Sequence, residues 1–148
     1  MSFRQVFIDA GDGPKVRVVG DSVRILATGE ETSAAYEIFE IRGPKESGPP
    51  PHFHAWSEAY FVTEGSIEVL VADRIVQAST GAFVNIPPGT VHHYRIVSDT
   101  AAFVVVTSPA GASGFFIDMD REAQGTTNID QIIGIAQRHG VGVPPPTA

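Results

Sequence analysis

The sequence predicts an all-β protein whose antiparallel strands form a sandwich or barrel. Short segments rich in β-branched and aromatic residues recur between about residues 15 and 108, with turn residues between them and no helical segment among them. From residue 113 the apolar spacing changes to that of helices. We therefore predict a single domain over residues 1–148, with a barrel over about 15–108 and a helical segment over about 113–140.

Composition narrows the class of protein and of partner. A chain of 148 residues with 43% hydrophobic and 18% charged residues is ordinary for one globular domain. The net charge of −7 argues against nucleic acid or an anionic membrane as a partner, since both need a basic surface. A small-molecule ligand is the remaining expectation. The first residues lack a secretory signal pattern and the longest apolar run, 101–106, is too short to span a bilayer, so we expect a cytoplasmic protein.

The first part of the barrel is predicted from turn chemistry. Val16 to Val19 and Val23 to Ala27 flank a Gly20-Asp21 turn and predict a hairpin. The segment 34–41 predicts a strand with both faces covered, because Phe39 and Ile41 break its alternation. Residues 42–51 carry four prolines and two glycines, which predicts a loop at the mouth of the barrel.

The remaining elements follow in order. Further strands are predicted over 59–63, 66–72, 74–77, 82–86, 91–97 and 101–107. Phe116, Met119 and Ala123 fall at helical spacing, and a second helix starts at a capping box formed by Asn128 and Gln131. Both helices are expected to pack on the barrel, where Phe115 and Phe116 would seal its end or form a subunit contact.

One stretch concentrates groups that bind metals. If the segment from residue 52 to 58 is extended, His52, His54 and Glu58 point to one face. His92 follows a Pro-Pro-Gly turn further along the chain. Because the chain has no cysteine, any metal must be held by nitrogen and oxygen, and three imidazoles with one carboxylate suit one divalent transition metal ion. Iron, manganese, nickel, cobalt, copper and zinc all accept such ligands.

The spacing of these residues resembles the two signature motifs of the cupin superfamily. The first is His52-x-His54-x3-Glu58-x6-Gly65, and the second is Gly81-x5-Pro87-x-Gly89-x2-His92. The resemblance covers about residues 48–97 and implies a double-stranded β-helix, the jelly-roll barrel of cupins. Two positions depart from the usual motifs, Gly48 and Ile96, and neither is a ligand.

The resemblance to quercetinase-like cupins implies a dioxygenase. In such an enzyme Glu58 is both a metal ligand and the base that deprotonates a small aromatic or phenolic substrate before reaction with O₂. Two alternatives stay open, a non-redox metal-dependent isomerase, decarboxylase or hydrolase, and a non-catalytic small-molecule binding module. The family also implies a homodimer.

Four other side chains near or outside the motifs are assigned by position. Tyr60 and Tyr94 share strand parity with Glu58 and His92, so they are expected either to contact a flat substrate or to be ordinary core tyrosines. His93 has the opposite parity and is expected to face outward. His139 is expected to be a cation at a helix end.

Overall fold

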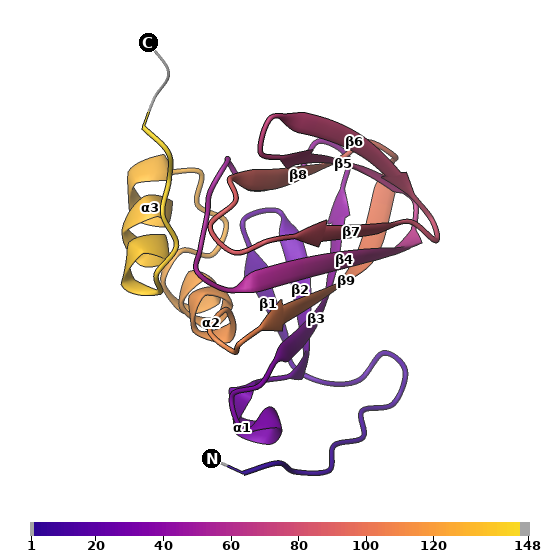
Figure 1. Ribbon diagram of the computed structural model, residues 1–148, viewed down its shortest axis with the longest axis vertical. Coiled ribbons are helices and arrows are strands. Elements are labelled where there is room, and N and C mark those ends of the chain that lie inside the picture. Colours follow the sequence, from indigo (N-terminus) through magenta and orange to yellow (C-terminus); the bar gives the residue numbers. More distant parts are fainter. Residues whose placement is uncertain (1, 146–148) are drawn as a thin grey trace.

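The computed structural model describes residues 2–145 (Figure 1). Its strands are β1 Lys15–Val18, β2 Asp21–Ala27, β3 Glu37–Pro44, β4 Ser57–Glu64, β5 Ser66–Val71, β6 Arg74–Ser79, β7 Phe83–Ile86, β8 His92–Ile96 and β9 Thr100–Ser108. Its helices are α1 Gly29–Thr32, α2 Ser113–Glu122 and α3 Ile129–Arg138. None of the helices in the described part of the chain is long and apolar enough to cross a membrane.

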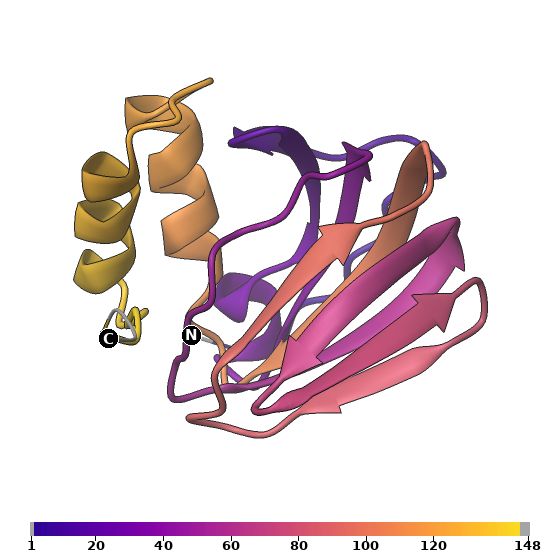
Figure 2. The same cartoon turned by 90° about the horizontal axis from the view of Figure 1, so that it is seen from above.

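The strands form two antiparallel sheets that face each other. One sheet has the order β1-β2-β3-β9-β4-β7 and the other the order β6-β5-β8. The apolar side chains between them make the main core, in which Phe39, Val62 and Phe103 are fully buried. Helices α2 and α3 lie side by side against one end of this assembly (Figures 1 and 2). The predicted all-β jelly-roll fold with short C-terminal helices is confirmed.

The first hairpin forms as predicted, with its turn one residue earlier. Val16 pairs with Val23, and Val18 pairs with Asp21, so the two-residue turn is Val19-Gly20. Asp21 is therefore the first residue of β2 and not a turn residue. Because it shares the parity of Val23, its carboxylate points into the barrel and is buried.

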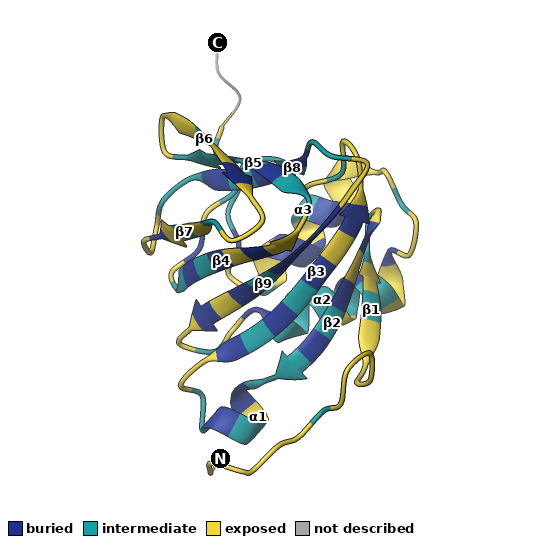
Figure 3. Ribbon diagram, turned by 90° about the vertical axis from the view of Figure 1, so that its right-hand side faces the viewer, coloured by how far each residue is buried: buried dark blue, intermediate teal, exposed yellow. Residues whose placement is uncertain are grey.

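Strand β3 differs from the prediction at both ends and in its faces. It begins at Glu37 and continues to Pro44, inside the segment predicted as a loop. Pro44 is tolerated because the pairing with β2 ends at Arg42, so no ladder bond is lost on that side. One face of β3, with Glu37, Phe39 and Ile41, is buried, and the other is partly open, so the expectation of two covered faces is wrong (Figure 3).

The two longer helices lie where the sequence placed them. The Asn128 side chain accepts a hydrogen bond from the Gln131 backbone N–H at 3.2 Å, which begins α3. The reciprocal half of the predicted capping box does not form, because the Asn128 N–H donates to Thr126 Oγ1 at 3.1 Å and Gln131 Oε1 accepts from the same hydroxyl at 3.1 Å. The four-residue helix α1 was not predicted, since it is too short for an apolar period.

A buried carboxylate joins the helical end to the barrel. Glu37 Oε1 accepts hydrogen bonds from the backbone N–H groups of Gly111, Ala112 and Ser113, which precede or begin α2. Its Oε2 accepts from the Gly29 N–H at 3.0 Å and from the Ser113 hydroxyl at 2.7 Å. Burial by itself raises the pKa of Glu37, but these bonds outweigh it and hold the pKa below its usual value. The start of α2 is thereby tied to the inner face of the large sheet.

Candidate metal centre

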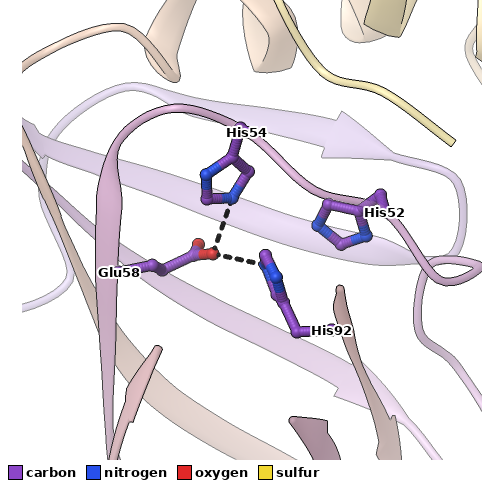
Figure 4. A group of neighbouring side chains, drawn as sticks. All are labelled: His52, His54, Glu58 and His92. Atoms are coloured by element: carbon purple, nitrogen blue, oxygen red, sulfur yellow. Dashed lines mark hydrogen bonds and ion pairs between the residues drawn. The ribbon is translucent and has the colours of Figure 1, made fainter. Parts of the chain in front are cut away.

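Four side chains from three parts of the chain converge inside the barrel. His52 and His54 come from the segment before β4, Glu58 from β4 and His92 from the start of β8 (Figure 4). One ligand atom from each lies within 4.8 Å of the others. His54, Glu58 and His92 are buried. This is an arrangement that can hold a metal ion.

The backbone brings His52 to His92 by direct pairing. The His52 N–H donates to the His92 carbonyl at 3.0 Å, and the His92 N–H returns a bond to the His52 carbonyl at 2.9 Å. The chain then bends at Ala55 and Trp56, and β4 begins only at Ser57. The assumption of one continuous extended segment is therefore wrong, and the bend itself turns the histidines toward Glu58.

Each histidine is oriented by a backbone carbonyl two residues away. Nδ1 of His52 lies 2.9 Å from the Pro50 oxygen, Nδ1 of His54 lies 3.0 Å from the Trp56 oxygen, and Nδ1 of His92 lies 2.7 Å from the Thr90 oxygen. A carbonyl oxygen can only accept, so each Nδ1 carries a proton. In the neutral imidazole the other nitrogen, Nε2, is then the one that presents a lone pair, as a metal ligand must.

The contacts between these side chains call for a positive charge among them. Glu58 Oε2 lies 3.0 Å from His54 Nε2 and 2.8 Å from His92 Nε2. If both imidazoles are neutral, three lone pairs face one another, which is unfavourable unless protons or a cation stand between them. A divalent metal satisfies all three together, and its preference for imidazole and carboxylate fits this donor set.

Burial and neighbouring charges shift the titration of two of these groups. Burial lowers the pKa of His52 to about 4, with a further contribution from the charge of His92. Burial alone would raise the pKa of Glu58, but the hydrogen bonds with His54 and His92 outweigh it and lower the pKa to about 2. At neutral pH, His52 is therefore neutral and Glu58 is ionised, which are the forms that bind a metal.

Trp56 supports His54 in a way that the sequence did not indicate. Its indole ring stacks on the His54 imidazole with the ring centroids 4.3 Å apart and the planes at 10°. Its carbonyl is also the acceptor for His54 Nδ1. The single tryptophan of the chain thus fixes both the plane and the rotation of one candidate ligand.

The cluster opens onto a cavity of about 290 Å³. Of the cluster, His52 and Glu58 line this cavity, and Tyr60 and Tyr94 line it as well. The rest of the wall is mostly apolar and includes side chains of α2 and α3, as the helices cover this end of the barrel (Figure 2). The helical contributors are Phe115, Phe116, Met119, Ile129, Ile132, Ile133 and Ala136. Phe115 and Phe116 both line the cavity, and Phe116 also packs edge-on against Phe39 with their ring centroids 4.9 Å apart.

The two remaining histidines lie away from the cluster. His93 is half-buried and has the opposite parity to its buried neighbours His92 and Tyr94, so it faces outward. His139 ends α3, where its Nε2 lies 2.6 Å from Asp118 Oδ2 on α2.

Asp21 is a polar group near the cavity that the sequence did not reveal. The Tyr94 hydroxyl donates a short hydrogen bond to its Oδ2, and the Ser47 hydroxyl donates to its Oδ1 at 2.5 Å. Gly43 makes room for this carboxylate, since a Cβ at residue 43 would lie 2.0 Å from Asp21 Oδ1. Nothing in the local pattern signals the role, because these residues are 22 to 73 positions apart from Asp21 in the sequence.

The comparison with protein families agrees with the resemblance of the motifs to those of cupins. The model of the cupin domain matches residues 39–108, which include the four clustered side chains. Quercetin 2,3-dioxygenase of Bacillus subtilis is 28% identical over 111 residues, which are 74% of this chain and 33% of that protein. This chain therefore spans about a third of the length of that relative.

Solved structures agree on the fold. An RmlC-like cupin from Shewanella frigidimarina superposes with a TM-score of 0.66 at 20% identity, over 74% of this chain and 96% of that one. The polyketide cyclase RemF from Streptomyces resistomycificus gives a TM-score of 0.62 at 25% identity, over 71% of this chain and 80% of that one. The fold, the candidate centre and these similarities define a cupin with a His₃Glu cluster, and this chain belongs to the cupin superfamily.

Proposed function

We propose that this protein is a metal-dependent enzyme that acts on a small aromatic or phenolic molecule, and that its reaction is a dioxygenation. The observation that carries the proposal is that the His₃Glu cluster contributes His52 and Glu58 to the wall of a mostly apolar cavity. A bound divalent metal would polarise a ligand oxygen and, if it is redox-active, exchange electrons with O₂. His52, His54, Glu58 and His92 would hold it.

The chain's own residues would do the rest of the work. The apolar wall formed by α2 and α3 would exclude water and hold a flat ligand against the tyrosines. Glu58 is ionised and lines the cavity, so it could accept the proton of a ligand hydroxyl. The similarity to quercetin 2,3-dioxygenase, whose name gives a phenolic substrate, supports a substrate of this class.

The direct test is reconstitution followed by a substrate screen. Protein purified without added metal is analysed for its metals, then loaded separately with iron, manganese, nickel, cobalt and copper. An oxygen electrode then follows flavonols, catechols and diketones. We expect O₂ uptake with at least one metal and one substrate class. The absence of uptake under every condition would contradict the dioxygenase.

The role of Glu58 is tested by Glu58→Gln, with Glu64→Gln at the exposed end of the same strand as the control. If Glu58 is the base, turnover falls by about 100-fold or more while the three histidines still retain metal. Unchanged metal loading together with unchanged turnover would remove the base from the mechanism.

A second candidate, non-redox chemistry at the same centre, is favoured by one observation. RemF, which is 25% identical to this chain, is described as a polyketide cyclase, and an apolar cavity suits such a substrate equally well. Here the metal would act as a Lewis acid. Substrate loss under strict anaerobiosis would favour this chemistry, whereas ligand binding without turnover in any atmosphere would favour a binding module.

We also infer a homodimer formed through the outer face of the large sheet. Phe61 and Phe83 pair across β4 and β7 on this face and are 48% and 64% exposed. Val106 on β9 adds further exposed apolar surface. Sedimentation should give a dimer mass for the wild type and a monomer mass for Phe61→Glu. A wild-type monomer mass that is independent of concentration would count against the dimer.

A further inference from the structure

The two tyrosines that line the cavity differ in what their hydroxyl groups can offer a ligand. Tyr60 on β4 and Tyr94 on β8 are both buried, and their rings meet edge to face with the centroids 6.1 Å apart. Strand parity made them equivalent in the sequence. Their hydrogen bonds separate them.

The proton of Tyr94 is already committed. Its hydroxyl donates to Asp21 Oδ2, while Ser47 donates to the other oxygen of the same carboxylate. A phenol has one proton, and Tyr94 donates it to Asp21, so Tyr94 has no proton left for the cavity. Gly48 reinforces this position, because its φ of +151° lets the loop approach the Tyr94 carbonyl, where a Cβ would lie 1.9 Å away. Tyr94 is therefore a fixed part of the wall.

The proton of Tyr60 has no acceptor in the protein. Among residues 2–145, none forms a hydrogen bond with the Tyr60 hydroxyl, although the side chain is only 2% exposed and lines the cavity. A phenol is protonated at neutral pH, and among the described residues the Tyr60 oxygen is not one of the fully enclosed atoms without a partner, so this unused donor is open to the cavity. A ligand that places an acceptor here gains a hydrogen bond, which makes Tyr60 a point of selection for a ligand.

The charge of the cavity wall limits the ligand further. Apart from His52 and Glu58 at the metal end, the described lining residues include no lysine, arginine, aspartate or other glutamate. An anionic or cationic group placed among the apolar residues of α2 and α3 would have no counter-charge, and burying it would be costly. The part of the ligand away from the cluster should therefore be uncharged.

We propose that Tyr60 selects the ligand by donating its hydroxyl proton to an uncharged oxygen acceptor, a carbonyl, on an otherwise apolar ring system, while Asp21 withholds Tyr94 from that role. This deepens the proposed function and rests on it only in using the same cavity. If Tyr60 is the donor, the protein should bind a ligand with the carbonyl more tightly than a ligand of the same shape without it.

The test uses 9-fluorenone and fluorene, two rigid tricyclic probes that differ in the carbonyl. Both are titrated against the 148-residue chain, as purified and zinc-loaded, since zinc has no redox chemistry that could consume the ketone. We expect Tyr60→Phe to weaken fluorenone binding by about 5- to 10-fold, the ratio expected from one hydrogen bond, and to leave fluorene binding unchanged. Tyr94→Phe is the matched control and should leave the ratio of the two affinities unchanged.

An infrared measurement shows which tyrosine donates the hydrogen bond. The carbonyl stretch of bound fluorenone should lie at lower wavenumber in the wild type and in Tyr94→Phe, and return to its position in apolar solvent in Tyr60→Phe. The proposal is overturned if Tyr94→Phe alone removes the shift, if no variant changes the ratio of affinities, or if neither probe binds. The outcome is separate from that of the oxygen-uptake screen, because neither binding nor the infrared shift requires turnover.

Discussion

The two ends of the cavity are built on different physical grounds. At the metal end, three histidines are held by hydrogen bonds to the carbonyl oxygens of Pro50, Trp56 and Thr90 and by the β-bridge between residues 52 and 92, and they surround the carboxylate of Glu58. At the helical end the wall is apolar and its position depends on packing and on the Glu37 anchor. At the metal end the positions of individual ligand atoms are held, whereas the helical end defines only the space that a ligand can fill.

The two ends also differ in what they share with other cupins. The family model covers residues 39–108 and so includes the whole metal cluster, but it stops before α2 and α3. The shared segment supplies the centre, and the segment outside it supplies much of the surface that a ligand would touch. Substitutions at the helical end should therefore change which ligand binds without loss of metal, and substitutions at the metal end should release the metal.

The largest effect is expected from His92→Ala at the metal end. Contacts outside the ligand shell are commonly worth 10- to 100-fold in metal affinity, so loss of a ligand should exceed about 100-fold. Metal content after dialysis against a weak chelator measures this. His93→Ala, the adjacent residue on the outer face, is the control and should retain metal. Equal metal loss in both variants would remove His92 from the centre.

Glu37→Gln should destabilise the attachment of the helices to the barrel without loss of metal. The amide places an N–H₂ group where Oε2 accepted from Gly29 and Ser113, so two charge-assisted hydrogen bonds are lost, at a cost of about 4 kcal/mol of unfolding free energy. Urea unfolding measures the loss. Glu40→Gln, on the open face of the same strand, is the control. A variant as stable as the wild type would show that Glu37 is not the anchor of α2.

Low pH should decrease the unfolding free energy of the metal-free protein, because ionisable groups at the metal end become protonated. The pKa of His52 is lowered from 6.5 to about 4 on folding, so the unfolded state takes up its proton first, and stability is lost as pH falls from 6.5 to 4. The loss from this group is at most about 3 kcal/mol. Glu58, whose pKa falls from 4.5 to about 2, acts in the same direction at lower pH. The stability contributed by Glu58 is present above pH 4.5 and is lost as pH falls toward 2.

Urea unfolding in the presence of a chelator at pH 7, 5.5 and 4.5 tests the contribution of His52. The stability of His52→Gln should fall less over this range than that of the wild type. Identical pH profiles for the two proteins would exclude His52 as a source of the acid sensitivity.

Met119→Ala should have the smallest effect on stability and a selective effect on ligand binding. Met119 is fully buried between the helices and the barrel and lines the cavity, so its truncation should cost about 2 kcal/mol of unfolding free energy and enlarge the ligand space. Metal content should stay at the wild-type level. Probe titrations with tricyclic and larger tetracyclic aromatic hydrocarbons should show a shift toward the larger ring system. Loss of metal in this variant would contradict the independence of the two ends.

Much of the fold could be predicted because local patterns and tertiary contacts agree. Period and turn chemistry predict the first hairpin, although not the exact position of its turn, together with the strands after Ser57 and the two later helices. The prediction failed at β3, where a glutamate faces the core and a proline ends a paired strand. In both cases a distant partner decided the outcome, the N–H groups before α2 for Glu37 and the early end of the β2 ladder for Pro44.

The residues of the cluster could be identified before the fold was known, because the spacing of His52, His54, Glu58 and His92 belongs to one motif pair. The alternation that places Tyr60 and Tyr94 toward the interior could be identified in the same way. Which of the two hydroxyls is free depends on tertiary contacts, since Asp21 lies 73 residues from Tyr94 and meets it across the barrel. Periodicity indicates which face of a strand a side chain lies on. The partner of a buried polar group depends instead on which residue the fold brings within about 3 Å, and no local sequence pattern indicates that contact.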